Sequence, residues 1–308
     1  MTARTATLTG FCAILLWSTL ALFAAMSGRV PPFQLAAMTF VVGGLLILAI
    51  AGLRGRLGRA WPTPASFALG LYGLFGDTAL YYAAVKTAPP AEANLIHYLW
   101  PLLIVLFAAL LPGGGLKARH LAGALIGLAA TGLLVSGGLG SGGGLSLGHG
   151  LAALGALTWA SYSVVSRRFA AVPSESLGLT MLGCAVLALA CHLAFEASLW
   201  SLTATEWGSV LGLGLGAIGL AFVLWDVGMK RGDVALLGVA SYAAPVLSTV
   251  VLVLCGYAPA SWLLALSCAL IVVGALVAGG GARRRAENVA PLSSAGAAAP
   301  GNPAPPAA

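Results

Sequence analysis

The residues best suited to chemistry lie in one short stretch, EANLIHYLWPLL, at residues 92–103. On a helix turning about 100° per residue, a group of polar residues and one proline share an arc of about 100°: Asn94, His97, Tyr98 and Pro101. Trp100 borders this arc. Polar residues at membrane depth usually face a bundle interior or a water-filled cavity, so this stripe is expected to face inward.

An acid on a neighbouring segment extends this group. Asp77 lies midway along the apolar segment 66–86, at a depth close to that of His97, because the chain turns at Pro89 and Pro90 and returns. Tyr81 follows Asp77 by one helical turn and shares its face. Three roles are open for Asp77: a structural partner of His97 and Tyr81, a binding site for an ammonium group or cation, and a carrier of protons.

Signatures of enzymes and metal sites are missing from the sequence. It has no HExxH, GxSxG or Walker-type GxxxxGK[ST] motif and no cluster of metal ligands. Five cysteines lie in apolar runs without a CxxC pair, which is typical of buried small side chains. The sequence therefore predicts no enzyme, no cofactor and no metal.

Composition predicts the environment of these residues. Of the 308 residues, 60% are hydrophobic and 7% are charged, whereas soluble domains carry roughly 25% charged residues. The pattern is typical of an all-α integral membrane protein, in which a span needs about 20 apolar residues. We expect ten spans, at 7–27, 33–53, 66–86, 91–111, 118–136, 147–168, 175–195, 207–229, 234–255 and 260–280.

The basic residues predict the orientation of these spans. With ten spans, 13 of the 15 Lys and Arg residues fall on the side of the N-terminus, and only Arg29 and Lys86 fall on the other. Because positive charge accumulates in cytoplasmic loops, both termini are expected in the cytoplasm. The net charge of +7 is scattered between apolar runs, which argues against a nucleic-acid partner. Residues 283–308 are expected to form a disordered cytoplasmic tail.

The chain also carries a repeat. The Gly-rich connector 136–150 separates a first half, 1–135, from a second half, 151–282. A shift of 144 residues aligns Lys86 with Lys230, Tyr81 with Trp225, Tyr98 with Tyr242 and Pro101 with Pro245, and a shift of 142 aligns Trp17 with Trp159. Five spans per half make the halves inverted in the membrane, a plan that recurs in secondary transporters.

The matched prolines and the deep aromatic residues suggest further roles. Proline lacks the N–H that bonds four residues back, so Pro101 and Pro245 are expected to kink their helices at matched positions and to act as hinges. Trp17, Trp100 and Trp159 lie deep in their spans, where they could stack on a ring or fill the core. Tyr162 lies one turn from Trp159.

Taken together, these features resemble the drug/metabolite transporter superfamily in its EamA-domain branch, over residues 7–280. The strings ALYYAAVKTAPPAEANLIHYLWPLL, WASYSVVSRR and LWDVGMKRGDVALLGVASYAAPVLS resemble exporters of aromatic amino acids in particular. The resemblance implies export of phenylalanine, tyrosine and tryptophan by alternating access, across the bacterial cytoplasmic membrane. The sequence departs from the EamA pattern in one respect: EamA domains often carry a Gly-Glu pair just after the fourth and ninth spans, and this sequence has none there.

We therefore expect a central cavity between the halves of a monomeric transporter. The substrate ring would stack against tryptophan or against Tyr242, and its charged ends would meet Asn94, His97 and Ser241, with Asp77 orienting His97. The alternatives are a multidrug efflux transporter for flat organic cations, a transporter of other small metabolites, and a membrane enzyme. Membrane lipid is the other expected partner.

Overall fold

The computed structural model describes part of the chain: residues 2–110, 118–119, 121–123, 125–127, 129–130, 133, 146–169, 171–231, 237, 240–241 and 243–279. Within these residues all regular secondary structure is helical, and no strand occurs. Most of the connector, Tyr242 and the tail at 283–308 lie outside the described residues.

The helices of the first half follow the predicted spans. They are α1 (Ala3–Trp17), α2 (Leu20–Met26), α3 (Pro32–Leu53), α4 (Pro64–Gly70), the π-helical segment η2 (Leu71–Phe75), α5 (Gly76–Thr87), α6 (Pro90–His97) and α7 (Trp100–Leu110). A short 3₁₀ turn, η1, covers Leu57–Arg59. Of the fifth predicted span, 118–136, the structure describes only short pieces.

The second half has a similar succession. Its helices are α9 (Leu147–Ser166), α10 (Leu177–Phe195), α11 (Ala204–Gly212), the π-helical segment η5 (Leu213–Leu220), α12 (Ala221–Arg231), α14 (Ala243–Leu254) and α15 (Trp262–Gly279). Two 3₁₀ turns, η3 (Arg167–Phe169) and η4 (Ser174–Ser176), connect α9 to α10.

Local chemistry explains where these helices begin. Thr2 precedes α1, and its side chain accepts the N–H of Thr5. Proline occupies the first turn of α3, where its missing N–H costs nothing. Thr203 and Glu206 start α11 with a reciprocal capping box. Among the residues that the structure describes, four stretches are long and apolar enough to cross a membrane: Ala3–Met26, Pro32–Leu53, Ser174–Phe195 and Ala204–Gly228.

Several spans are interrupted rather than straight. The first breaks at Ser18 and Thr19, and the fourth breaks at Tyr98 and Leu99. The sequence predicted a kink within a continuous fourth helix, whereas the structure ends α6 and begins α7 at Trp100. Pro101 therefore lies in the first turn of α7, where proline fits without strain.

The two π-helical segments lie at matched positions. A shift of 144 residues carries Leu71–Phe75 to 215–219, which falls inside Leu213–Leu220. π-Helical turns are rare and occur frequently at functional sites. In both halves the segment directly precedes a helix, α5 or α12, that lines a cavity described below.

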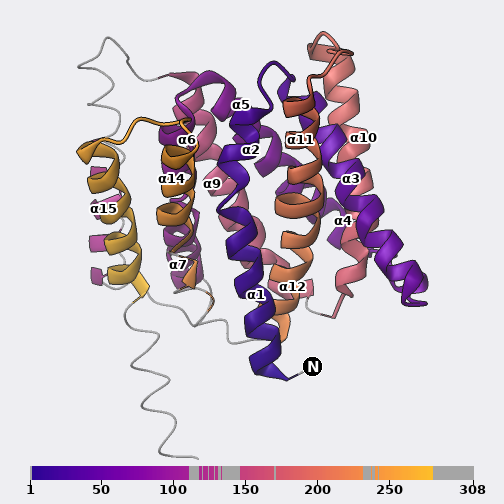
Figure 1. Cartoon of the computed structure of the whole chain (residues 1–308). Helices are drawn as coiled ribbons and strands as arrows, with labels where there is room; N and C mark the ends of the chain where they lie inside the picture. The colour runs from indigo at the N-terminus through magenta and orange to yellow at the C-terminus, as the bar shows by residue number, and fades with distance from the viewer. Residues whose placement is uncertain are drawn as a thin grey trace, which may run out of the picture.

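The halves interleave instead of packing as separate domains. Helix α3 packs against α10, α1 against α12, and α5 against α9, so each of these pairs joins one half to the other (Figure 1). The helices run roughly side by side, with the start of α1 at one end of the bundle. We call this end the basic end, because most of the described arginines of the connecting segments lie there: Arg54, Arg56, Arg59, Arg168 and Arg231. The other end, with Ser27, Lys86 and Glu206, is the far end.

Candidate functional site

A central cavity of about 480 Å³ lies between the two halves. Residues from seven α-helices line it, together with two residues, one small and one aliphatic, from the π-helical segment η5. The lining residues are Trp17, Leu20, Asp77, Thr78, Tyr81, Tyr82, His97, Tyr98, Trp100, Trp159, Ala217, Ile218 and Phe222. Ligand sites for small molecules are mostly apolar with a few polar groups, as here.

Trp17 is the centre of the aromatic wall. Its ring centroid lies 5.1–6.3 Å from four other rings: Trp100, Trp159, Phe222 and Trp225. The indole N–H donates to the carbonyl of Ala217 at 3.0 Å, which fixes the ring against η5. Edge-to-face pairs such as these stabilise by about 0.5–1.5 kcal/mol each beyond burial. The cavity therefore has a rigid aromatic surface.

The polar side of the cavity is a pair formed by Asp77 and His97. His97 Nε2 lies 2.7 Å from Asp77 Oδ1, and both side chains are almost entirely buried. The imidazole also lies against the ring of Tyr81, with centroids 4.7 Å apart. On α9, a Cβ added at Gly155 would stand 3.2 Å from the imidazole, so glycine leaves room for it. The pairing keeps the carboxylate and imidazole in one orientation, since an unpaired ionisable group at this depth is costly.

Asn94 and Ser241 lie behind the wall instead of lining the cavity. The amide of Asn94 accepts the Tyr81 hydroxyl at 3.0 Å and donates to Ser248 at 3.0 Å. Ser241 donates to the carbonyl of Leu237 at 2.9 Å. In this structure Asn94 links α6 to α5 and α14, whereas Ser241 bonds within its own helical turn, and neither makes the expected contact with the cavity.

The other predicted site residues are distributed as follows. The structure brings Trp17, Asp77, Tyr81, His97, Trp100 and Trp159 together around the central cavity. Tyr162 lies farther toward the basic end, in a second cavity. Tyr242 is outside the described residues, and of Pro245 only its place in α14 is described.

Sequence reasoning missed several lining residues, among them Thr78, Tyr82 and Phe222. Phe222 lies three residues before Trp225, so a shared helical face could have revealed it. Thr78 and Tyr82 are neighbours of Asp77 and Tyr81 but belong to the next face of the helix. They reach the cavity because first-half helices close around it from two sides.

Two further cavities continue from the central one toward the basic end. The second, of about 430 Å³, is lined by Trp159, Tyr162, Ser163, Ser166, Leu177, Phe222, Trp225 and Asp226. The third, also about 430 Å³, shares Tyr162, Ser166, Leu177 and Asp226 with the second and reaches Ser66 and Pro173 near the connecting segments. Shared walls make these three spaces a series that runs from the centre to the basic end.

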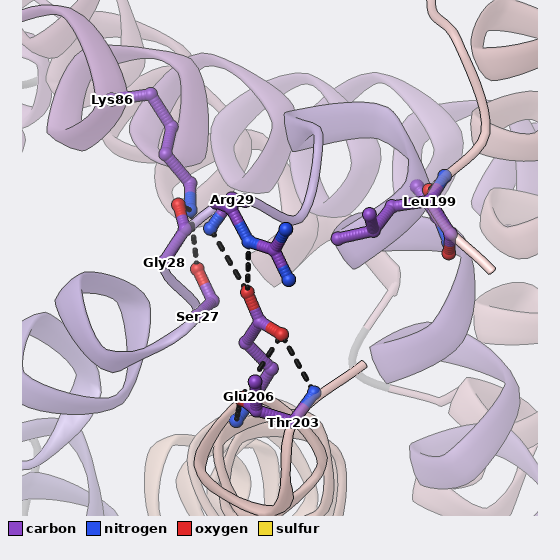
Figure 2. A network of polar contacts seen from close by, with 8 residues as sticks. Ser27, Gly28, Arg29, Lys86, Leu199, Thr203 and Glu206 are labelled. Carbon is purple, nitrogen blue, oxygen red and sulfur yellow. Dashed lines mark hydrogen bonds and ion pairs between the residues drawn. The ribbon is translucent and has the colours of Figure 1, made fainter. Parts of the chain in front are cut away.

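The far end is tied together by polar contacts (Figure 2). Lys86, at the end of α5, donates to Ser27 Oγ at 2.7 Å and to the carbonyl of Gly28 at 2.6 Å. Glu206, at the start of α11, accepts the backbone N–H of Arg29 at 3.2 Å and lies 3.5 Å from Arg29 Nε. Gly28 has a φ of +52°, and a Cβ there would stand 3.1 Å from Glu206 Oε1, so this close contact requires glycine.

Two more contacts at the far end cross between the halves. Glu196 accepts the backbone N–H groups of Phe33 and Gln34 at 3.0 and 3.1 Å, which satisfies the first turn of α3. His149 Nε2 lies 2.9 Å from Glu92 Oε2. The contacts of Glu196, Glu206 and His149 thus join helix ends of both halves on this side.

The family model for EamA-like transporters matches residues 4–136 and 146–280, one match in each half. The chain belongs to the EamA-like transporter family. Together with its long apolar helices, this makes it a multi-pass membrane transporter, as the sequence predicted.

Named relatives narrow the comparison. The chain is 52% identical over 285 residues to the aromatic amino acid exporter YddG of Ancylobacter novellus, covering 90% of this chain and 98% of the relative. It is 31% identical to the aromatic amino acid exporter YddG of Salmonella typhimurium, covering 92% and 100%. A crystal structure 51% identical in sequence matches with a TM-score of 0.74 over 92% of this chain and 99% of the other.

Proposed function

We propose that this protein exports aromatic amino acids, namely phenylalanine, tyrosine and tryptophan, from the cytoplasm across the bacterial cytoplasmic membrane. The observation that carries the proposal is the central cavity, in which an aromatic wall faces a single carboxylate–imidazole pair. Two relatives named as aromatic amino acid exporters, each matched over more than nine-tenths of its length, support the same substrate class.

The cavity suits a zwitterion with a flat ring. The ring would lie among the indoles of Trp17, Trp100 and Trp159, where apolar burial and ring stacking both stabilise it. The ammonium would approach the Asp77 carboxylate, and the second ring nitrogen of His97 would face a charged end of the substrate, as an acceptor in the neutral imidazole and as a donor in the imidazolium. Asn94 would act indirectly, by holding α6 against α5 and α14, Ser241 would act through its own helical turn, and Tyr242 would complete the wall.

The proposed architecture is ten spans in two inverted five-helix repeats, with both termini in the cytoplasm. Its domains would be 1–135 and 151–282, joined by the connector 136–150 and followed by the tail 283–308. Three features support this: the charge bias of the loops, the matched π-helical segments, and the fact that Trp17 and its repeat partner Trp159 contact each other at 5.7 Å. Under this topology the basic end faces the cytoplasm.

Transport would proceed by alternating access in a single protomer. The cavities that continue toward the basic end would admit substrate, while the far-end contacts of Glu206, Glu196 and His149 keep the exit closed. Export then requires these contacts to separate. Pro101, next to the break in the fourth span, and Pro245, near the start of α14, would serve as hinges for this motion.

A second candidate function is efflux of flat organic cations, with Asp77 as the cation site. Uptake into proteoliposomes separates the two, with labelled phenylalanine, tryptophan, threonine and a viologen-type cation compared under one set of conditions. The proposal expects phenylalanine and tryptophan to move well above protein-free liposomes and threonine to stay near that level. Equal movement of threonine and phenylalanine would refute the aromatic claim, and movement of the cation alone would favour the alternative.

A further inference from the structure

The second cavity, between the central cavity and the basic end, holds polar groups that transport through the central cavity does not explain. We propose that it is a separate subsite, which binds the ammonium group of an aromatic amino acid on its way to the central cavity. The proposal rests on the proposed function for its substrate class. It names Asp226 and Ser163 as the polar groups of the subsite and Trp225 as its aromatic surface.

The position of the subsite follows from shared walls. Trp159 and Phe222 line both the central and the second cavity, and their rings stack with centroids 5.2 Å apart. A molecule in the second cavity is therefore separated from the Asp77–His97 pair by one aromatic layer. On its other side, the third cavity continues past Asp226 to Ser66 and Pro173, near the connecting segments of the basic end.

Ser163 indicates that a ligand belongs here. It exposes 8% of its surface, and its Oγ has no hydrogen-bond partner among the described residues. Buried hydroxyl groups in folded proteins nearly always have a partner, so an exception calls for an explanation. Because Ser163 lines the second cavity, a polar group of a bound molecule can supply the missing hydrogen bond.

Asp226 supplies the charge. Its carboxylate accepts the hydroxyl of Ser174, which ties α12 to the turn before α10, and it also lines the second and third cavities. A carboxylate that lines a cavity can form charge-assisted hydrogen bonds with an ammonium group that enters the cavity. Trp225 lines the same cavity, where its ring can meet a cation or the substrate ring.

The test uses inverted membrane vesicles, whose outer surface is the cytoplasmic face, and labelled phenylalanine. Asp226→Asn is expected to raise the half-saturation concentration roughly tenfold, in line with loss of a charge-assisted hydrogen bond. Phenethylamine, which keeps the amine, should inhibit phenylalanine uptake strongly in the unchanged protein and weakly in Asp226→Asn. 3-Phenylpropionate, which lacks the amine, should inhibit phenylalanine uptake equally in the unchanged protein and in Asp226→Asn.

Matched variants keep the result specific. Ser163→Ala is expected to raise the half-saturation concentration a few-fold, whereas Ser161→Ala, on the same helix but hydrogen-bonded to Tyr72 at 2.7 Å, should leave it unchanged. Ser174→Ala removes one hydrogen bond to Asp226 and keeps the carboxylate, so competition by phenethylamine should be preserved. Asp226→Glu keeps the charge and should also preserve competition by phenethylamine. This variant provides a second measurement if Asp226→Asn is poorly produced.

The outcomes are distinguishable from failure of the proposed function. Phenylalanine uptake by the unchanged protein in the same vesicles tests that function first, and its absence would refute the function itself. Where uptake is present, an unchanged half-saturation concentration in Asp226→Asn and Ser163→Ala would overturn the subsite. A Ser174→Ala variant that reproduces Asp226→Asn, or equal loss of both competitors, would overturn it as well, because Asp226 would then only hold the turn before α10.

Discussion

His97 Nε2 lies 2.7 Å from Asp77 Oδ1 in the wall of a cavity that is otherwise mainly aromatic. The two residues come from α5 and α6, on either side of the turn at Pro89. Each needs the other, because an ionisable group buried at membrane depth is stabilised by a partner. The pair is therefore the polar reference point against which a substrate would be oriented.

His97→Ala is expected to lower phenylalanine transport roughly tenfold or more, as expected for loss of a hydrogen bond to a charged group at about 1.5–3 kcal/mol. Asp77→Asn should have an effect of similar size, because it removes the charge that orients the imidazole. Initial uptake rates in proteoliposomes measure both. If the pair acts as a unit, the double variant will be no slower than the slower single variant. Additive losses, or unchanged transport in His97→Ala, would remove the pair from the site.

Trp100→Ala is expected to raise the half-saturation concentration for phenylalanine about 2- to 10-fold, since a lost ring contact costs about 0.5–1.5 kcal/mol. Trp61→Ala is the matched control, because Trp61 is 77% exposed and lines none of the three cavities. Concentration dependence of uptake is the measurement. Equal effects of the two substitutions would show that the indole at position 100 has no particular part in binding.

Tyr81→Phe is expected to destabilise the protein by about 1–3 kcal/mol, because it leaves the buried Asn94 carbonyl without its donor. Tyr72→Phe removes a hydroxyl of an exposed tyrosine that contacts Ser161, and it should change stability by less than about 0.5 kcal/mol. Unfolding of the purified protein in detergent, followed as a function of denaturant or temperature, compares the two. A larger loss in Tyr72→Phe would contradict the role given to Asn94.

Glu206→Gln is expected to increase opening at the far end, because it weakens the charge-assisted contact with Arg29. The readout is the rate at which a membrane-impermeant thiol reagent, added outside cells, modifies Thr78→Cys in a chain whose five native cysteines are replaced. This rate should rise a few-fold in Glu206→Gln. Glu175→Gln breaks the Glu175–Arg56 ion pair at the basic end and should not raise it. An increase in both variants would show general loosening and contradict a specific closure.

Much of this arrangement follows from the sequence. The lengths of the apolar runs predicted the helices within the described residues, and the tight turn at Pro89 placed Asp77 at the depth of His97. Family membership was predicted from the strings around those residues and is confirmed by the family match. These features depend on local composition and on neighbouring segments of the chain, which a sequence displays directly.

Other features depend on packing between distant segments. Asn94 shares the polar arc of His97, but the arc does not show whether a side chain faces a cavity or a neighbouring helix. In the structure the side-chain amide of Asn94 donates a hydrogen bond to Ser248 of α14. Asp226 lies near the end of its span, where an acid is commonplace, and only the approach of α9 gives it a buried cavity. The break at Tyr98 likewise follows from how α6 and α7 pack, since proline alone also permits a continuous kinked helix.

Counterflow tests the central claim most directly. Proteoliposomes are loaded with an excess of unlabelled amino acid and diluted into a trace of labelled phenylalanine. An alternating-access exporter of aromatic amino acids predicts a transient accumulation of label above its equilibrium level when the vesicles contain phenylalanine, tyrosine or tryptophan, and none when they contain threonine. Accumulation of equal size with threonine inside, or equilibration of label without any transient excess, would contradict the account.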